Sequence, residues 1–185
     1  MTSDRWWRAA CWGILLLPAV PGCLLVGHTQ YRAEILPDGS ARVVLRYIDL
    51  RSDGETDSAV VRDLDILLDS FRSDGEHLPR GVLLMEKHLG LQGDTLVAEV
   101  LLEAADLADM EGFSRQEGLP TVIVPAGQQI TWTNGAVSRW HEGGLRIQWR
   151  DTARYIECDV RPSTNSGART LAPLYRERQE PGGKQ

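Results

Sequence analysis

The chain has 185 residues, 42% of them hydrophobic and 25% charged, and its 26 acidic and 20 basic residues give a formal net charge of −6. This length suits a single domain with a sizeable core. The acidic balance argues against a general nucleic-acid binder, which needs clustered Lys and Arg to displace counterions.

The first segment has the layout of an export signal. Arg5 and Arg8 form a short positive region, residues 9–20 are apolar, and Val20-Pro21-Gly22-Cys23 follows. That tetrapeptide resembles the lipobox of bacterial lipoproteins. The resemblance implies that a signal peptide of residues 1–22 is removed and that Cys23 receives a diacylglyceryl group and becomes the mature N-terminus.

Two alternatives stay open for this segment. Pro21 departs from the more typical Ala, Ser or Thr, and the chain stays apolar as far as Val26. Residues 9–26 are therefore just long enough to cross a thin bilayer as an uncleaved helix, although Pro18 and Pro21 argue against a straight helix there. A plain secretory signal is the second alternative.

Cleavage would leave an acidic body held by lipid. It removes two of the 20 basic and one of the 26 acidic residues, so the mature chain carries a formal charge of −7. Such a surface does not favour adhesion to anionic lipid, so acyl chains on Cys23 supply the attachment, and stable tethering needs more than one of them. The expected location is the cell membrane or outer membrane, facing the periplasm or the exterior.

The first third of the mature chain predicts a hairpin and a helix. Tyr31 to Leu36 and Ala41 to Leu50 are expected strands around the turn Pro37-Asp38-Gly39-Ser40. Asp57 or Ser58 is the expected cap of a helix that ends near Phe71. The apolar positions follow helical spacing and are expected to face the core: Val60, Leu64, Leu67, Leu68 and Phe71. The polar positions are assigned to a solvated face: Arg62, Asp63, Asp65 and Asp69.

A second hairpin and a short helical turn follow. Residues 81–91 and 95–104 alternate as strands. The first of them places Leu83, Met85, Leu89 and Leu91 on one side, with an interruption at Lys87. Residues 105–113 are expected to form a short helical turn with Leu107, Met110 and Phe113 directed inward.

The last third predicts further strands and then a tail. Residues 122–124, 129–133 and 154–160 are expected strands, with a turn at Asn134-Gly135. The segment 161–185 is rich in Pro, Ser, Gly, Arg and Glu and is predicted to be disordered. The prediction is an α+β domain over residues 23–160: an antiparallel β-sheet of hairpins and a meander with one main amphipathic helix packed on one face.

These features together resemble a group of uncharacterised exported bacterial lipoproteins. The resemblance covers residues 23–160 and implies location and an α+β fold, but it implies no reaction. It depends on the lipobox, the Pro37–Ser40 hairpin, the acidic helix, Ala105-Asp106-Leu107, Thr133-Asn134-Gly135 and Leu145-Arg146-Ile147-Gln148-Trp149.

No residue pattern predicts a metal, cofactor or nucleophile site. The four histidines lack metal-ligand spacing, and Gly112-Phe113-Ser114-Arg115-Gln116 lacks the closing Gly of a nucleophile elbow. Asp106, Asp109 and Glu111 lack the ligand order of a calcium loop and are assigned to a solvated face. Cys158, without a cysteine partner once Cys23 is acylated, is expected to be a buried, inert thiol.

The tryptophans divide into two groups. In the two-residue alternation of their strands, Trp132 and Trp149 fall on the same side as the apolar residues. Both are therefore expected in the core. Trp140 lies in a polar loop between Arg139 and His141 and is the expected exposed contact for a partner.

Two classes of function follow. The favoured one is a tethered, non-enzymatic binding or structural module that engages an envelope protein or polymer. The alternative is an envelope enzyme using carboxylates such as Glu99 or Glu103 near His88, although strand parity directs both carboxylates toward solvent.

Overall fold

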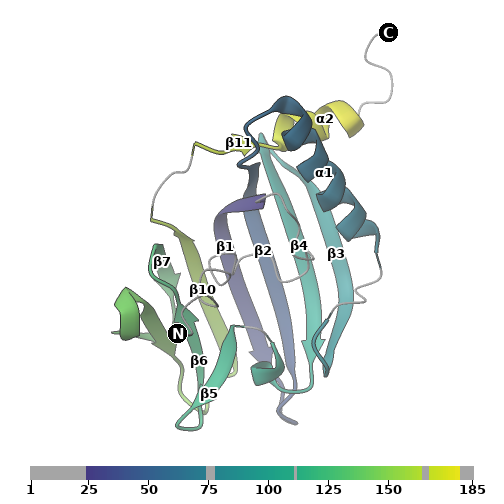
Figure 1. Ribbon diagram of the computed structural model, residues 1–185. Coiled ribbons are helices and arrows are strands. Elements are labelled where there is room, and N and C mark those ends of the chain that lie inside the picture. The colour runs from purple at the N-terminus through teal and green to yellow at the C-terminus, as the bar shows by residue number, and fades with distance from the viewer. Residues whose placement is uncertain (1–23, 74–77, 111, 164–166, 180–185) are drawn as a thin grey trace, which may run out of the picture.

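The computed structural model describes residues 24–73, 78–110, 112–163 and 167–179. The larger of two antiparallel sheets has the strand order β3-β4-β2-β1-β10-β7, and β11 adds to β2 (Figure 1). The strands are β1 (Leu24–Ile35), β2 (Ala41–Ser52), β3 (Val82–Gln92), β4 (Thr95–Ala104), β7 (Gln128–Thr133), β10 (Tyr155–Pro162) and β11 (Arg169–Thr170).

A smaller antiparallel sheet, in the order β5-β6-β9-β8, forms the second layer. Its strands are β5 (Phe113–Gln116), β6 (Leu119–Val124), β8 (Ala136–Arg139) and β9 (Leu145–Gln148). Two α-helices, α1 (Asp57–Arg72) and α2 (Ala172–Gln179), and two short 3-10 helices, η2 (Leu107–Asp109) and η3 (His141–Gly143), are the described helical segments.

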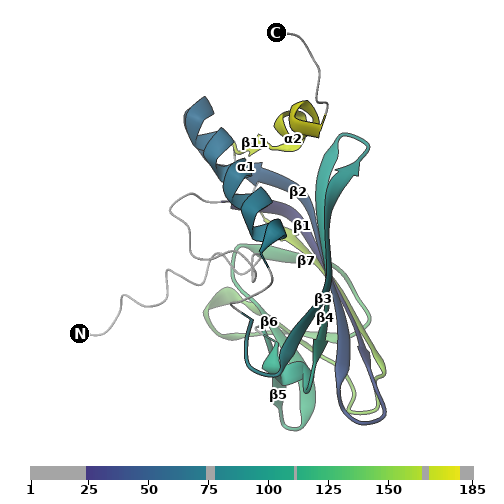
Figure 2. The same ribbon diagram turned by 90° about the vertical axis from the view of Figure 1, so that its right-hand side faces the viewer.

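Helix α1 and the smaller sheet cover the same face of the main sheet (Figure 2). Helix α1 buries Val60, Leu64 and Leu67, and the smaller sheet buries Val122 and Ile147, all in one core. None of the described helices covers the opposite face of the main sheet (Figure 2). The predicted α+β fold, with an antiparallel sheet and a main amphipathic helix on one face, is therefore confirmed.

The N-terminus of α1 is capped by Thr56 instead of the predicted Asp57 or Ser58. The Thr56 Oγ1 accepts a hydrogen bond from the Ala59 N–H at 3.2 Å, which satisfies one of the free donors of the first turn. Asp57 is the first helical residue, where its charge complements the helix dipole.

Asp63 is buried, contrary to its predicted place on the solvated face of α1. Only 4% of Asp63 is exposed, and its Oδ2 accepts a hydrogen bond from the buried Ser52 Oγ at 2.5 Å. The Ser52 Oγ in turn accepts from the Gly54 N–H at 2.9 Å. Because Ser52 ends β2 directly beneath the helix, this polar contact joins α1 to the sheet, and helical spacing cannot reveal it.

A β-bulge in β3 overturns the predicted face of Leu83 and Met85. The register with β4 shifts between Leu84 and Glu86, and an extra residue in one strand reverses the alternation that follows. Leu83 is 63% and Met85 52% exposed, whereas Leu84, Leu89 and Leu91 pack against the core.

The side chain of Lys87 lies on the core-facing side of β3, where it contacts the end of α1. Its Nζ donates hydrogen bonds to the carbonyl of Ser70, at 2.9 Å, and to the carbonyl of Ser73. These carbonyls lie at the C-terminal end of α1, where a cation is favoured by the helix dipole. The interruption in the apolar pattern is thus a contact that holds the end of the helix.

The segment 169–179 is ordered, so the predicted disorder from residue 161 onward is wrong for these residues. Strand β11 pairs with the end of β2, and Leu171, Ala172 and Tyr175 are buried in the main core. The Tyr175 hydroxyl donates to the Leu89 carbonyl at 2.8 Å. The domain therefore extends past residue 160, because these three side chains belong to its core.

Candidate functional site

The predicted lipid attachment residue, Cys23, lies outside the described residues. The next residue, Leu24, begins β1, which starts seven positions before the predicted Tyr31. Leu24 is buried and pairs with Ser52 at the end of β2. Leu24, Leu25 and Val26, the end of the predicted 9–26 span, are strand residues. Within the described ranges no helix has the length and apolar character to traverse a bilayer.

Trp140 lies in the connection between β8 and β9, on the smaller sheet. The connection is closed by two backbone hydrogen bonds: the Trp140 N–H donates to the Gly144 carbonyl at 2.9 Å, and the Gly144 N–H donates to the His141 carbonyl at 3.2 Å. Gly143, with φ of 80°, takes the left-handed conformation that the turn requires. Trp140 itself is half-buried, so the loop presents a fixed part of the indole to solvent.

Two side chains, Arg146 and His141, contact the Trp140 indole, and Ser138 contacts Arg146. We call these four residues the Trp140 cluster: Ser138, Trp140, His141 and Arg146. The Arg146 Cζ lies 5.2 Å from the centroid of the Trp140 ring, within the range of a cation–π contact. The Arg146 Nε–H donates to the Ser138 Oγ at 3.1 Å. The His141 ring meets the indole edge-to-face, with centroids 4.9 Å apart.

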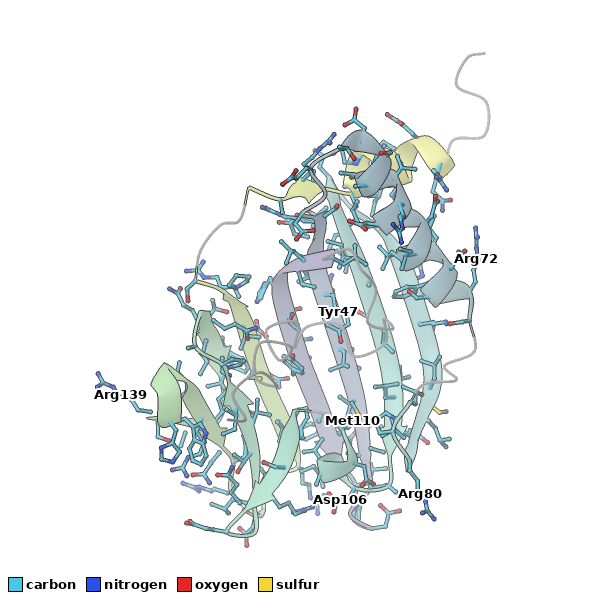
Figure 3. The ribbon with its side chains drawn as sticks, viewed as in Figure 1. Tyr47, Arg72, Arg80, Asp106, Met110 and Arg139 are labelled. Atoms are coloured by element: carbon cyan, nitrogen blue, oxygen red, sulfur yellow. The ribbon has the colours of Figure 1, made fainter. Side chains whose placement is uncertain are left out.

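The register of the smaller sheet explains this arrangement. Ser138 and Arg146 are direct cross-strand partners in the β8–β9 pair, and directly opposed residues share a face of a sheet. Trp140 follows Ser138 by two residues and keeps the same side. Arg139, of opposite parity, is exposed and extends away from the main sheet (Figure 3). Trp140 can be predicted from its polar neighbours in the chain, but Arg146 and Ser138 cannot, because their places beside it depend on the β8–β9 register.

The two tryptophans predicted in the core have different environments. Trp149 is buried, and its Nε1–H donates to the Asn134 Oδ1 at 2.6 Å, so that prediction is confirmed. Trp132 is 49% exposed, so its prediction is wrong. A register shift between Asp159 and Val160 pairs Val160 with Ile130 and Asp159 with Trp132, which turns Trp132 to the open face of the main sheet.

Exposed Trp132 has polar neighbours that the sequence did not bring together. Its cross-strand partner Asp159 accepts a hydrogen bond from the Gln30 Nε2 at 3.1 Å. The His28 Nε2 lies 3.7 Å from the same Asp159 oxygen. These side chains lie on a flat sheet surface, and the described cleft between the sheets has a different, largely apolar lining that includes Tyr31, Phe113, Val122 and Gln128.

The residues of the alternative enzyme hypothesis are partly adjacent but do not form a pocket. His88 lies directly opposite Glu99 in the β3–β4 pair, and both are exposed, as strand parity predicted for Glu99. Glu99 lies 3.8 Å from the Arg46 Nε, and Glu103 lies 3.0 Å from the Arg42 Nε. The described cleft between the sheets contains neither a histidine nor a carboxylate.

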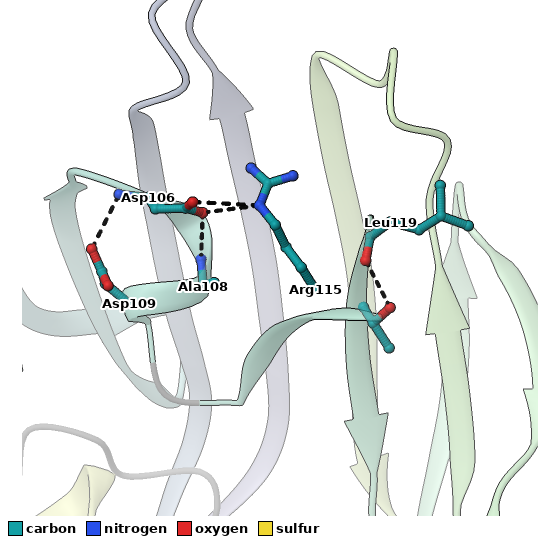
Figure 4. Close-up of polar contacts among 6 residues, drawn as sticks. Asp106, Ala108, Asp109, Arg115 and Leu119 are labelled. Atoms are coloured by element: carbon teal, nitrogen blue, oxygen red, sulfur yellow. Dashed lines mark hydrogen bonds and ion pairs between the residues drawn. The ribbon is translucent and has the colours of Figure 1, made fainter. Parts of the chain in front are cut away.

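Two of the three acidic residues considered for calcium, Asp106 and Asp109, make local contacts (Figure 4), and the third, Glu111, lies outside the described residues. Asp106 Oδ1 accepts from the Ala108 N–H at 2.9 Å, and Asp109 Oδ2 accepts from the Asp106 N–H at 3.2 Å, which is a capping box for η2. The Arg115 Nε lies 3.3 Å from Asp106. Over the described part of the chain, no group of three His, Cys, Asp or Glu side chains is arranged to hold a metal ion.

Cys158 is fully buried in β10, as expected. Burial raises the pKa of its thiol to about 12, and the neighbouring Asp159 charge acts in the same direction. At neutral pH the side chain is therefore a thiol and not a reactive thiolate.

Comparison of the chain with protein-family models, with curated proteins and with solved structures finds no match.

Proposed function

We propose that the protein is a lipid-anchored, non-enzymatic binding module of the bacterial cell envelope, tethered through Cys23 and contacting an envelope protein or polymer through Trp140. One observation carries the tether: Leu24, the residue directly after the lipobox cysteine, is already a buried strand residue of the folded body. Removal of residues 1–22 would thus leave each described strand and helix intact, and an acylated Cys23 would hold the folded body at the surface of the bilayer.

The start of β1 also favours lipid attachment over a helical span. Because Leu24 already belongs to a strand, the apolar stretch before it is limited to residues 9–23. About 15 residues at 1.5 Å each extend about 22 Å, against a hydrocarbon core of about 30 Å. The acylated protein would lie at the cell membrane or the outer membrane and face the periplasm or the exterior.

Binding is favoured over catalysis by the environment of the candidate residues. His88 and Glu99 are exposed on a sheet surface, whereas an acid–base site needs groups enclosed around a reacting atom. The Trp140 indole, by contrast, is held by Arg146 and His141 and still reaches the surface. A rigid, half-buried aromatic side chain is a typical anchor in protein recognition.

The tether is tested by mass spectrometry of the native N-terminus and by membrane fractionation. We expect the purified protein to begin at an acylated Cys23, and Cys23→Ala to move the protein from the membrane to the soluble fraction or to leave it as an uncleaved precursor. An unmodified N-terminus at Met1, with equal membrane retention of Cys23→Ala, would contradict lipid anchoring.

The contact surface is tested by crosslinking intact cells that carry Trp140→Ala. We expect this variant to fold normally and to lose the crosslinked products of the wild type. Trp132→Ala is the matched control, because Trp132 is also partly exposed but lies on the main sheet. Equal crosslinking by wild type and Trp140→Ala would exclude this surface.

A further inference from the structure

We propose that the Trp140 cluster binds an oxyanion, a carboxylate or phosphate group carried by an acidic polymer, with Arg146 as the residue that recognises the charge. This inference rests on the proposed use of the Trp140 surface and names the chemistry of its ligand.

The Arg146 guanidinium is held in place on two sides. Its plane is fixed by the Trp140 ring, 5.2 Å from Cζ, and its Nε–H is used by the Ser138 hydroxyl. A guanidinium has five N–H donors, so four donors on the two Nη atoms remain. Within the described side chains they meet no carboxylate. The edge formed by the two Nη atoms is therefore free to face a ligand.

Three arginines on or next to strands β8 and β9 make no ion pair with a described side chain. Arg139, Arg146 and Arg150 have no carboxylate within ion-pair distance among the described side chains. Arg32, Arg62, Arg80, Arg154 and Arg161 also lack such a partner among the described side chains. The remaining eight arginines have one: Arg42, Arg46, Arg51, Arg72, Arg115, Arg169, Arg176 and Arg178. The Arg146 charge beside Trp140 has no described ion-pair partner, and an anionic ligand is complementary to it.

The geometry suits an oxyanion in particular. Two parallel N–H groups on a planar guanidinium match two oxygens of a carboxylate or phosphate in a bidentate pair. Because Arg146 is already oriented by Trp140 and Ser138, little side-chain freedom is lost on binding. The indole also supplies an apolar wall beside the anion, where a carbon skeleton that bears the charged group can pack.

The proposal is tested by isothermal titration of the full chain in detergent with polyphosphate and with poly-L-glutamate, and with neutral dextran as the uncharged probe. We expect at least one anionic polymer to bind and dextran not to bind. Arg146→Gln should weaken the binding about tenfold, the loss typical of a bidentate charged contact. Arg146→Lys should restore only part of it, because a lysine keeps the charge but not the planar fork.

Arg62→Gln is the matched control. Arg62 is exposed on α1, has no ion pair among the described side chains, and its replacement changes the net charge by the same amount. We expect it to alter binding less than about twofold. Equal losses for Arg62→Gln and Arg146→Gln, or no binding of either anionic polymer by the wild type, would overturn the oxyanion site. Thermal unfolding of each variant verifies that it is folded.

The outcome can be separated from that of the proposed function. If Trp140→Ala loses its crosslinked partner whereas Arg146→Gln keeps it, the contact surface is supported and the oxyanion proposal is wrong. Preference for polyphosphate or for poly-L-glutamate assigns the group as phosphate or carboxylate.

Discussion

At the scale of single residues, Asp106 shows how a turn is stabilised by charge. The pKa of its carboxyl is lowered, first by the hydrogen bond from the Ala108 N–H and then by Arg115. The pKa of this carboxyl is 3.8 in the unfolded chain and lower in the folded chain. Its ionised form therefore stabilises the fold at pH values above 3.8. That contribution is lost as the pH falls through the folded pKa.

Asp106→Asn should therefore make the free energy of unfolding less dependent on pH below about pH 4. The magnitude is small, because the side chain is 44% exposed and Arg115 is screened by solvent. Urea unfolding at a series of pH values measures this dependence. Asp151→Asn, at an exposed carboxyl without an ion pair among the described side chains, is the control. An unchanged profile for Asp106→Asn would show that the η2 turn does not depend on this charge.

At the scale of elements, the C-terminal segment completes the core that the hairpins leave open. Leu171 is fully buried at the start of α2, and its N–H donates to the Leu50 carbonyl of β2 at 3.1 Å. Arg176 and Arg178 attach the same helix to Asp94 and Asp65 through ion pairs. The apolar contact dominates the energy, because exposed ion pairs contribute little.

Leu171→Ala should lower the free energy of unfolding by about 2–4 kcal/mol, the usual cost of a cavity in a core. Chemical denaturation monitored by circular dichroism measures it. Glu177→Ala, at an exposed position of the same helix, should change stability by less than about 0.5 kcal/mol. Equal stability of Leu171→Ala and the wild type would mean that α2 docks only transiently.

At the scale of the whole molecule, the fold has two distinct ends. Leu24, the end of β2 and β11 lie together, because Leu24 and Arg169 both pair with Ser52. The turn between β1 and β2, at residues 36–40, lies at the opposite end (Figure 1). The 12 residues of β1 extend about 40 Å at about 3.3 Å each. If Cys23 is acylated, the first end lies at the bilayer and the turn projects away from it.

This orientation predicts different lipid quenching of two fluorescent labels. The acylated protein is bound to vesicles containing a quencher lipid and labelled after Asp57→Cys or Asp38→Cys. Cys158 is fully buried, so the introduced thiol reacts selectively. The label at position 57, near β11 through the Asp57–Arg169 ion pair, should be quenched, and the label at position 38 should not. Equal quenching would contradict an upright body.

The sequence predicted those features that depend on local periodicity. The stripe Val60, Leu64 and Leu67 follows 3.6-residue spacing and is buried. The hairpins follow two-residue alternation, and Pro37-Asp38-Gly39-Ser40 forms the expected turn between β1 and β2. Trp140 is predicted to be an exposed contact because it is an aromatic residue among polar ones. These are inferences from neighbours in the chain, and they require no knowledge of which strands pair.

The tertiary structure decided what depends on register and on distant partners. One extra residue in β3 exposes Leu83, and another in β7 exposes Trp132. A bulge has no signature in alternation, because it is set by how two strands align. The contact of Ser52 with Asp63, the docking of Leu171 and the stacking of Arg146 on Trp140 likewise join separate segments. Composition and spacing therefore determined the α+β class. The makeup of the Trp140 cluster, in contrast, arose only when β8 aligned with β9 and placed a guanidinium over the indole.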